Sequence, residues 1–150
     1  MRIAAALLAL VLATGCSAAT AAAPTTSATA DAPLMVSEGG VLRPIENGSR
    51  LSLRSGYATV RLWPSPEDMD PNLQVGLFDA AGKPAVANVS VVAEMLDMDH
   101  GTETATGVLR DGLYQMHLSF GMQGRWRLVV HIARDGAEEI LTLVLPWVGF

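Results

Sequence analysis

Several residue types are scarce in this chain, and each scarcity excludes a class of protein. The only cysteine is Cys16, so no internal disulfide can form. Lys83 is the only lysine, and the formal net charge is −5. Nucleic acids and anionic lipid surfaces both attract clustered Lys and Arg side chains, and this composition argues against either as a partner.

The N-terminus has the organisation of an export signal. Arg2 supplies a charged start, and the apolar run 3–13 follows it. This run has roughly half of the ~20 residues that a membrane-spanning helix needs, so it is too short to cross a bilayer. We therefore expect residues 1–15 to be a signal peptide, whose loss would make the remaining chain one unit more acidic.

A lipid attachment site is expected directly after this signal. The sequence "LATGC" resembles the lipobox of bacterial lipoproteins, which implies a lipid on Cys16 and anchoring to a bacterial membrane on its periplasmic or cell-surface side. The sequence departs from that pattern at Ala13, where leucine is usual. Cleavage at an A-x-A site after Ala21 is the alternative.

Two regions with different compositions follow the anchor. Residues 16–33 are rich in Ala, Thr, Ser and Pro and hold no large apolar side chain, which predicts a flexible tether. From residue 34 onward, apolar and polar residues alternate in short stretches, a pattern typical of half-buried antiparallel strands. The stretches are 50–56, 57–63, 72–79, 88–96, 113–120, 125–133 and 138–147.

Turn signals separate these stretches. The dipeptides Asn47-Gly48, Asp111-Gly112 and Asp135-Gly136 accept the positive φ of hairpin turns, and Gly82 lies in a fourth turn. The pattern predicts an all-β domain over residues 34–150, an immunoglobulin-like antiparallel β-sandwich of about seven to eight strands.

The second half of the chain resembles the YtkA-like domain, also seen in FixH-type proteins. The resemblance covers roughly residues 57–133. The matching residues are Asp79, Gly82, Lys83 and Pro84, then Met95, Met98 and His100, then Gly112 and Tyr114, then Met122, Gly124, Trp126, Leu128 and Val130. It implies an exported or anchored sandwich of immunoglobulin-like type. FixH-type relatives are associated with assembly of a copper-containing terminal oxidase, but this chain lacks their membrane helix.

One group of side chains has the chemistry of a soft-metal site. Met95, Met98 and His100 lie close together in "EMLDMDHG", and Met122 and His117 could complete the set. Thioethers and imidazole suit Cu(I), so copper is the cofactor that this group would hold. Counting strands, with a short one around 106–110, places Met122 at the same end of the sandwich as Met98. The alternative is that these methionines only fill the core and cover its end.

His117 and His131 form a second candidate pair. If their strands pair as a hairpin through "GMQG", the two histidines are diagonal neighbours and could hold a surface metal ion. Without a third ligand, two such histidines are more often just surface residues.

Signals of catalysis are absent from the sequence. No serine lies in a G-x-S-x-G context, no histidine has an orienting partner nearby, and lipidation of Cys16 would leave no free thiol. The sequence therefore predicts a lipid-anchored, non-catalytic binding or accessory domain whose partner protein it does not identify. A copper-handling protein is the alternative.

Overall fold

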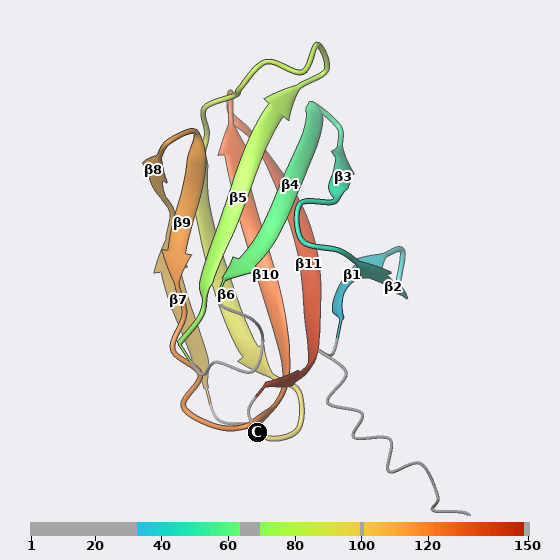
Figure 1. Ribbon diagram of the computed structural model, residues 1–150, viewed down its shortest axis with the longest axis vertical. Coiled ribbons are helices and arrows are strands. Elements are labelled where there is room, and N and C mark those ends of the chain that lie inside the picture. Colours follow the sequence, from blue (N-terminus) through green and yellow to red (C-terminus); the bar gives the residue numbers. More distant parts are fainter. Residues whose placement is uncertain (1–32, 64–69, 100, 149–150) are drawn as a thin grey trace, which may run out of the picture.

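Eleven strands in two antiparallel sheets make up the part of the chain that the structure describes (Figure 1). A computed structural model describes residues 33–63, 70–99 and 101–148. Sheet A has the order β2-β1-β11-β10-β6-β7, and sheet B has the order β3-β4-β5-β9-β8. The strands are β1 (Leu34–Glu38), β2 (Val41–Ile45), β3 (Arg50–Leu53), β4 (Gly56–Trp63), β5 (Asn72–Asp79), β6 (Asn88–Met95), β7 (Thr102–Thr106), β8 (Val108–Arg110), β9 (Leu113–His117), β10 (Gly124–Arg134) and β11 (Ala137–Val148).

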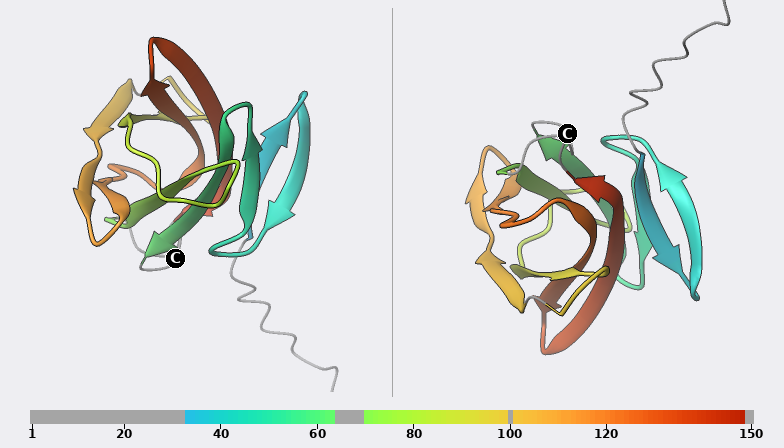
Figure 2. Two further views of the ribbon diagram at one scale, coloured as in Figure 1. Left: turned by 90° about the horizontal axis from the view of Figure 1, so that it is seen from above. Right: turned by 90° about the horizontal axis from the view of Figure 1, so that it is seen from below.

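The two sheets face each other across one apolar core, as the views along the long axis show (Figure 2). Alternate residues of each central strand point inward; in β6, for example, Val89, Val91, Ala93 and Met95 are buried. No polar or charged residue is buried among those that the structure describes. The predicted class, an all-β antiparallel sandwich, is confirmed.

The count of strands exceeds the predicted seven to eight for two local reasons. Residues before 50 form β1 and β2, which continue sheet A beyond β11. Residues 102–110 divide into β7 of sheet A and β8 of sheet B, because the chain changes sheets at Gly107. A Cβ at Gly107 would lie 3.1 Å from the Val89 carbonyl oxygen, so a glycine suits this close crossing.

Two of the three predicted hairpin turns are confirmed. Asp111 and Asp135 have φ of 52° and 53°, each followed by a glycine of positive φ, and they join β8 to β9 and β10 to β11. At Asn47-Gly48 the chain also turns, but it leads from sheet A into sheet B. The expectation of a hairpin there was wrong, because β3 pairs with β4 instead of β2.

The predicted hairpin between β9 and β10 was also wrong. β9 belongs to sheet B and β10 to sheet A, and the connecting residues bury Leu118 and Phe120 between the layers. β10 pairs instead with β6 and β11, which occupy both of its edges. His117 and His131 therefore lie on different sheets, and the proposed diagonal pair does not form.

Candidate functional site

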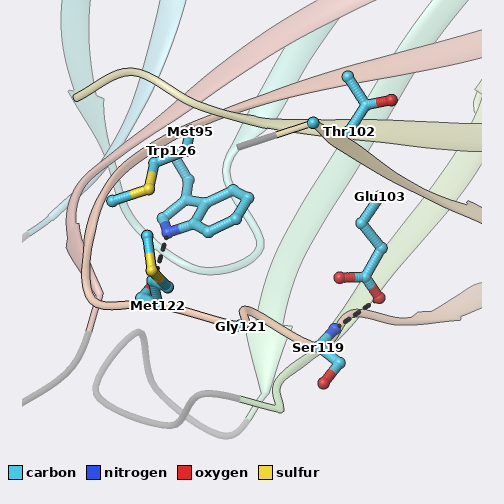
Figure 3. Close-up of a pocket in the computed structure, with 8 residues that line it drawn as sticks. Met95, Thr102, Glu103, Ser119, Gly121, Met122 and Trp126 are labelled. Atoms are coloured by element: carbon cyan, nitrogen blue, oxygen red, sulfur yellow. Dashed lines mark hydrogen bonds between the residues drawn. The ribbon is translucent and has the colours of Figure 1, made fainter. Parts of the chain in front are cut away.

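A hollow of about 320 Å³ opens at the end of the sandwich where β6 stops and β10 starts (Figure 3). Its deepest side chains come from a cross-strand pair, because Met95 lies opposite Trp126 in the ladder between these strands. Both positions point inward, and Met95 is 8% and Trp126 6% exposed. The residues that line the hollow are Met95, Gly101, Thr102, Glu103, Ser119, Gly121, Met122 and Trp126.

Trp126 forms the wall between the core and the hollow. Its ring packs against Phe120 with centroids 4.7 Å apart, and its indole Nε1 donates a hydrogen bond to the Met122 carbonyl oxygen at 3.2 Å. This bond ties the 118–123 connection to β10 and leaves the Met122 side chain half-buried at the hollow. In Figure 3 the thioethers of Met95 and Met122 both lie beside the indole.

Gly124 allows the strands to come this close together. Its φ is 150°, which side chains rarely adopt, and a Cβ there would lie 2.5 Å from the Met95 methyl group. The register between β10 and β11 also shifts between Gly124 and Trp126, as in the β-bulges that reshape sheets near their rims. A larger residue would push Met95 out of its place.

An ion pair lies next to the hollow, between the residues that follow Met95 and precede Trp126. Arg125 donates its backbone N–H to Asp97 Oδ2 and its Nε to Oδ1, both at 2.8 Å, while Leu96 N donates to the Arg125 carbonyl oxygen. The side-chain hydrogen bond from Arg125 holds the pKa of Asp97 below its usual value, and the same contact raises the pKa of Arg125. The chain just after β6 is thus fixed to the start of β10.

The opposite wall is polar. Glu103 faces the inner side of β7, since it lies opposite the buried Ala93. One carboxylate oxygen of Glu103 accepts a hydrogen bond from Ser119 N at 2.9 Å. Two thioethers, an indole and a carboxylate therefore surround one opening. Neither Glu103 nor Ser119 had been anticipated from the sequence, because only the strand register places them near Met95.

The residues predicted to bind a metal ion do not all lie together. Met95 and Met122 meet in the hollow, while Met98 is 52% exposed and does not line it. His117 is exposed at the end of β9 and lines a different hollow. His100 and Cys16 lie outside the described residues.

Two further findings concern the described residues alone. No three His, Cys, Asp or Glu side chains among them gather as ligands of a metal ion do. The same part of the chain contains no helix with the length and apolar character to cross a membrane.

The fold is that of a β-sandwich domain with a hollow at one end. Comparison with known families identifies the domain: residues 59–131 match the YtkA-like family, so the chain contains a YtkA-like domain. The match begins within β4 and ends within β10, inside the region of the predicted resemblance. No curated protein and no solved structure gives a significant match.

Proposed function

We propose that this protein is an exported, lipid-anchored and non-catalytic binding domain that takes its ligand at the end hollow. The observation that carries the proposal is the lining of that hollow, where Met95, Met122 and Trp126 face a polar wall with Glu103. Binding sites commonly combine apolar walls with a few placed polar groups in this way. The signal-like residues 1–15 and the lipobox-like sequence at Cys16 support export and anchoring.

The anchoring part of the proposal predicts the behaviour of a Cys16→Ser variant. A hydroxyl cannot accept the thioether-linked lipid, so the variant should stay as an uncleaved precursor or appear in the soluble fraction. Wild type should remain with membranes, and mass spectrometry of its N-terminus should show a lipidated Cys16. An unlipidated N-terminus at Ala22 would instead support cleavage after Ala21 and end this part of the proposal.

One observation favours a second candidate, a domain that handles Cu(I). The thioethers of Met95 and Met122 line the same hollow beside an indole, although β6 and the 118–123 connection are separated in sequence (Figure 3). Soft sulfur donors suit Cu(I), so this pair fits a soft cation better than a hard one. In this reading Met95 and Met122 would hold the ion, and Trp126 would shield it from water.

Titration with Cu(I) against a competing chelator tests the second candidate. Wild type should bind one ion and lose Trp126 fluorescence as it does so. Met122→Leu keeps the apolar bulk but removes a sulfur, so its affinity should fall by more than the roughly 10–100-fold that loss of an outer-shell partner costs. Met98→Leu is the matched control and should bind as wild type does. Absence of Cu(I) binding by wild type, or equal losses of Cu(I) affinity in Met122→Leu and Met98→Leu, would exclude copper at this hollow.

A further inference from the structure

The charged side chains of the two sheets are distributed unequally. Every arginine and histidine on the strands of sheet A has a carboxylate partner. The pairs are Arg43–Glu38, Arg125–Asp97, Arg127–Glu94, His131–Glu138 and Arg134–Asp135. The strands of sheet B carry four such residues, Arg50, Arg61, Arg110 and His117, and none of them forms an ion pair within the described part of the chain.

Acidic residues are almost absent from the strands of sheet B. Their single carboxylate is Asp79, at the last position of β5. It is engaged locally, because its Oδ1 accepts hydrogen bonds from the backbone N–H groups of Ala81 and Lys83, both at 2.9 Å. A sheet whose strands carry arginines but no carboxylate on the outer side is unexpected in a chain of net charge −5.

The three arginines and His117 share the outer face of sheet B, the face turned toward the viewer in Figure 1. Inward positions such as Val60 and Met116 are fully buried, so their strand neighbours Arg61 and His117 point outward. The register aligns a row across this face. It runs from Arg61 through Gln74 and Gln115 to Val108, and Asn72 lies beside His117 in the next row.

A hollow of about 350 Å³ lies at one side of this row, next to the β7–β8 crossing. Its lining includes Asn72, Thr106, Val108, Arg110, Gln115 and His117, and no carboxylate. Arg110, Asn72 and Gln115 therefore line one depression at the edge of this face. An arginine here can bind a planar carboxylate through two parallel hydrogen bonds.

We propose that the outer face of sheet B, together with the hollow at its edge, binds an acidic oligosaccharide that carries carboxylate groups. Arg110 and Arg61 pair with carboxylates, and Gln74, Gln115 and Asn72 bind the sugar hydroxyls. Amide side chains both donate and accept hydrogen bonds, as hydroxyl groups do. The proposal is independent of the end hollow and of copper.

Two other anionic ligand classes fit this face less well. The backbone groups of β4, β5 and β9 are used in the ladders between strands, so an acidic peptide lying across these three strands would have no free main-chain partners. Of the described strands of sheet B, only the edge strands β3 and β8 pair on one side alone. Single-stranded nucleic acid needs free aromatic faces for its bases. Tyr57 stacks on Phe78 at 4.8 Å, and the Arg50 guanidinium lies 4.5 Å from the Tyr57 ring centroid, so these rings are already covered in part.

Calorimetric titration with oligogalacturonate tests the proposal. Its methyl ester is the matched probe, because it keeps the sugar chain and removes the negative charge. Wild type should bind the acid and not the ester, and backbone amide shifts in NMR should map to β4, β5, β8 and β9. Arg110→Gln and Arg61→Gln should each weaken binding at least about tenfold, the loss of one charge-assisted hydrogen bond. Arg43→Gln, an exposed arginine of sheet A, is the control and should bind as wild type does.

Several results would overturn the proposal. They are no binding of oligogalacturonate at millimolar concentration, equal affinity for the ester, losses of the same size in Arg43→Gln, and amide shifts confined to sheet A. Tighter binding of polyglutamate or of a single-stranded oligonucleotide would assign the face to another class of anion. Because all three arginines are exposed, matched unfolding midpoints should confirm that the variants are folded.

Discussion

At the scale of single residues, the alternation of the sequence correctly predicted which large side chains are buried. Met95 and Trp126 are apolar positions of the alternating stretches 88–96 and 125–133, and both point into the sandwich. Tyr114 is 3% exposed, and its hydroxyl oxygen accepts a hydrogen bond from Ala87 N at 2.8 Å. These outcomes follow from position within a strand, which is a local property.

Replacing Trp126 tests directly whether its side chain is part of the core. Trp126→Ala removes the contact with Phe120 and the hydrogen bond to the Met122 carbonyl oxygen. We expect the free energy of unfolding to fall by about 3–5 kcal/mol, as for other large-to-small changes in a packed core. Urea unfolding followed by circular dichroism measures this. Met98→Ala, at an exposed position, is the control and should stay within about 0.5 kcal/mol of wild type. A similarly small loss for Trp126→Ala would contradict the assigned face.

At the scale of elements, the carboxylate of Glu139 joins the two sheets at the end of the sandwich opposite the end hollow. Glu139 of β11 lies opposite the inward-facing Ile132 and reaches the turn between β3 and β4. There it accepts hydrogen bonds from the backbone N–H groups of Arg54 and Ser55 and from the Ser55 hydroxyl. The two layers are thereby linked by side-chain contacts as well as by the core.

This link predicts a dependence of stability on pH. Partial burial raises the pKa of Glu139, but the hydrogen bonds from Ser55 and Arg54 outweigh burial and bring the pKa below its ordinary value of 4.5. As the pH falls, the unfolded chain therefore takes up this proton before the folded one does. The contribution of Glu139 is complete above about pH 5 and is lost as the pH drops through its folded pKa.

Glu139→Gln should show this effect in urea unfolding measured from pH 7 to pH 3. At pH 7 we expect the variant to be about 0.5–1.5 kcal/mol less stable than wild type, because it loses charge-assisted hydrogen bonds at a partly exposed site. The difference should shrink toward pH 3. The same substitution at the exposed Glu46 is the control. A difference that stays constant across this range would show that the Glu139 charge does not stabilise the fold.

At the scale of the whole molecule, the sandwich extends beyond the residues that match the YtkA-like family. β11 lies outside the match, yet it pairs with both β10 and β1. It also contributes Leu141, Leu143, Leu145 and Val148 to the core. The family match therefore covers the centre of the fold without β1, β2 and β11 of sheet A and without β3 of sheet B.

The folding of two fragments should show that the strands outside the family match are needed for stability. Residues 34–150 should fold alone and unfold cooperatively, because they hold every strand and the whole described core. Residues 59–131 should not fold, since β1, β2, β3 and β11 are missing and β10 loses its pairing with β11. Thermal unfolding by circular dichroism compares them. A cooperative transition in the shorter fragment would show that β11 is dispensable.

The sequence alone determined the class of fold, the inward face of each main strand and the glycine turns at residues 111–112 and 135–136. All of these depend on neighbours along the chain: alternation sets the face, and an Asp-Gly dipeptide accepts positive φ. The exposed Met98 and the inward Met95 differ for the same reason, because the strand ends between them.

Only the tertiary structure decided which strands share a sheet. Alternation is the same whether a strand pairs with the next one along the chain or with a distant one, so β9 and β10 could be mistaken for a hairpin. Because β9 and β10 lie in different sheets, His117 and His131 are not neighbours. β10 pairs with β6 instead, and this pairing places Met122 near Met95. In sheet B, Arg61, Arg110 and His117 share one face and have no carboxylate partners in the described part of the chain. Long-range pairing is chosen by how all strands together bury the core, and no local pattern records that choice.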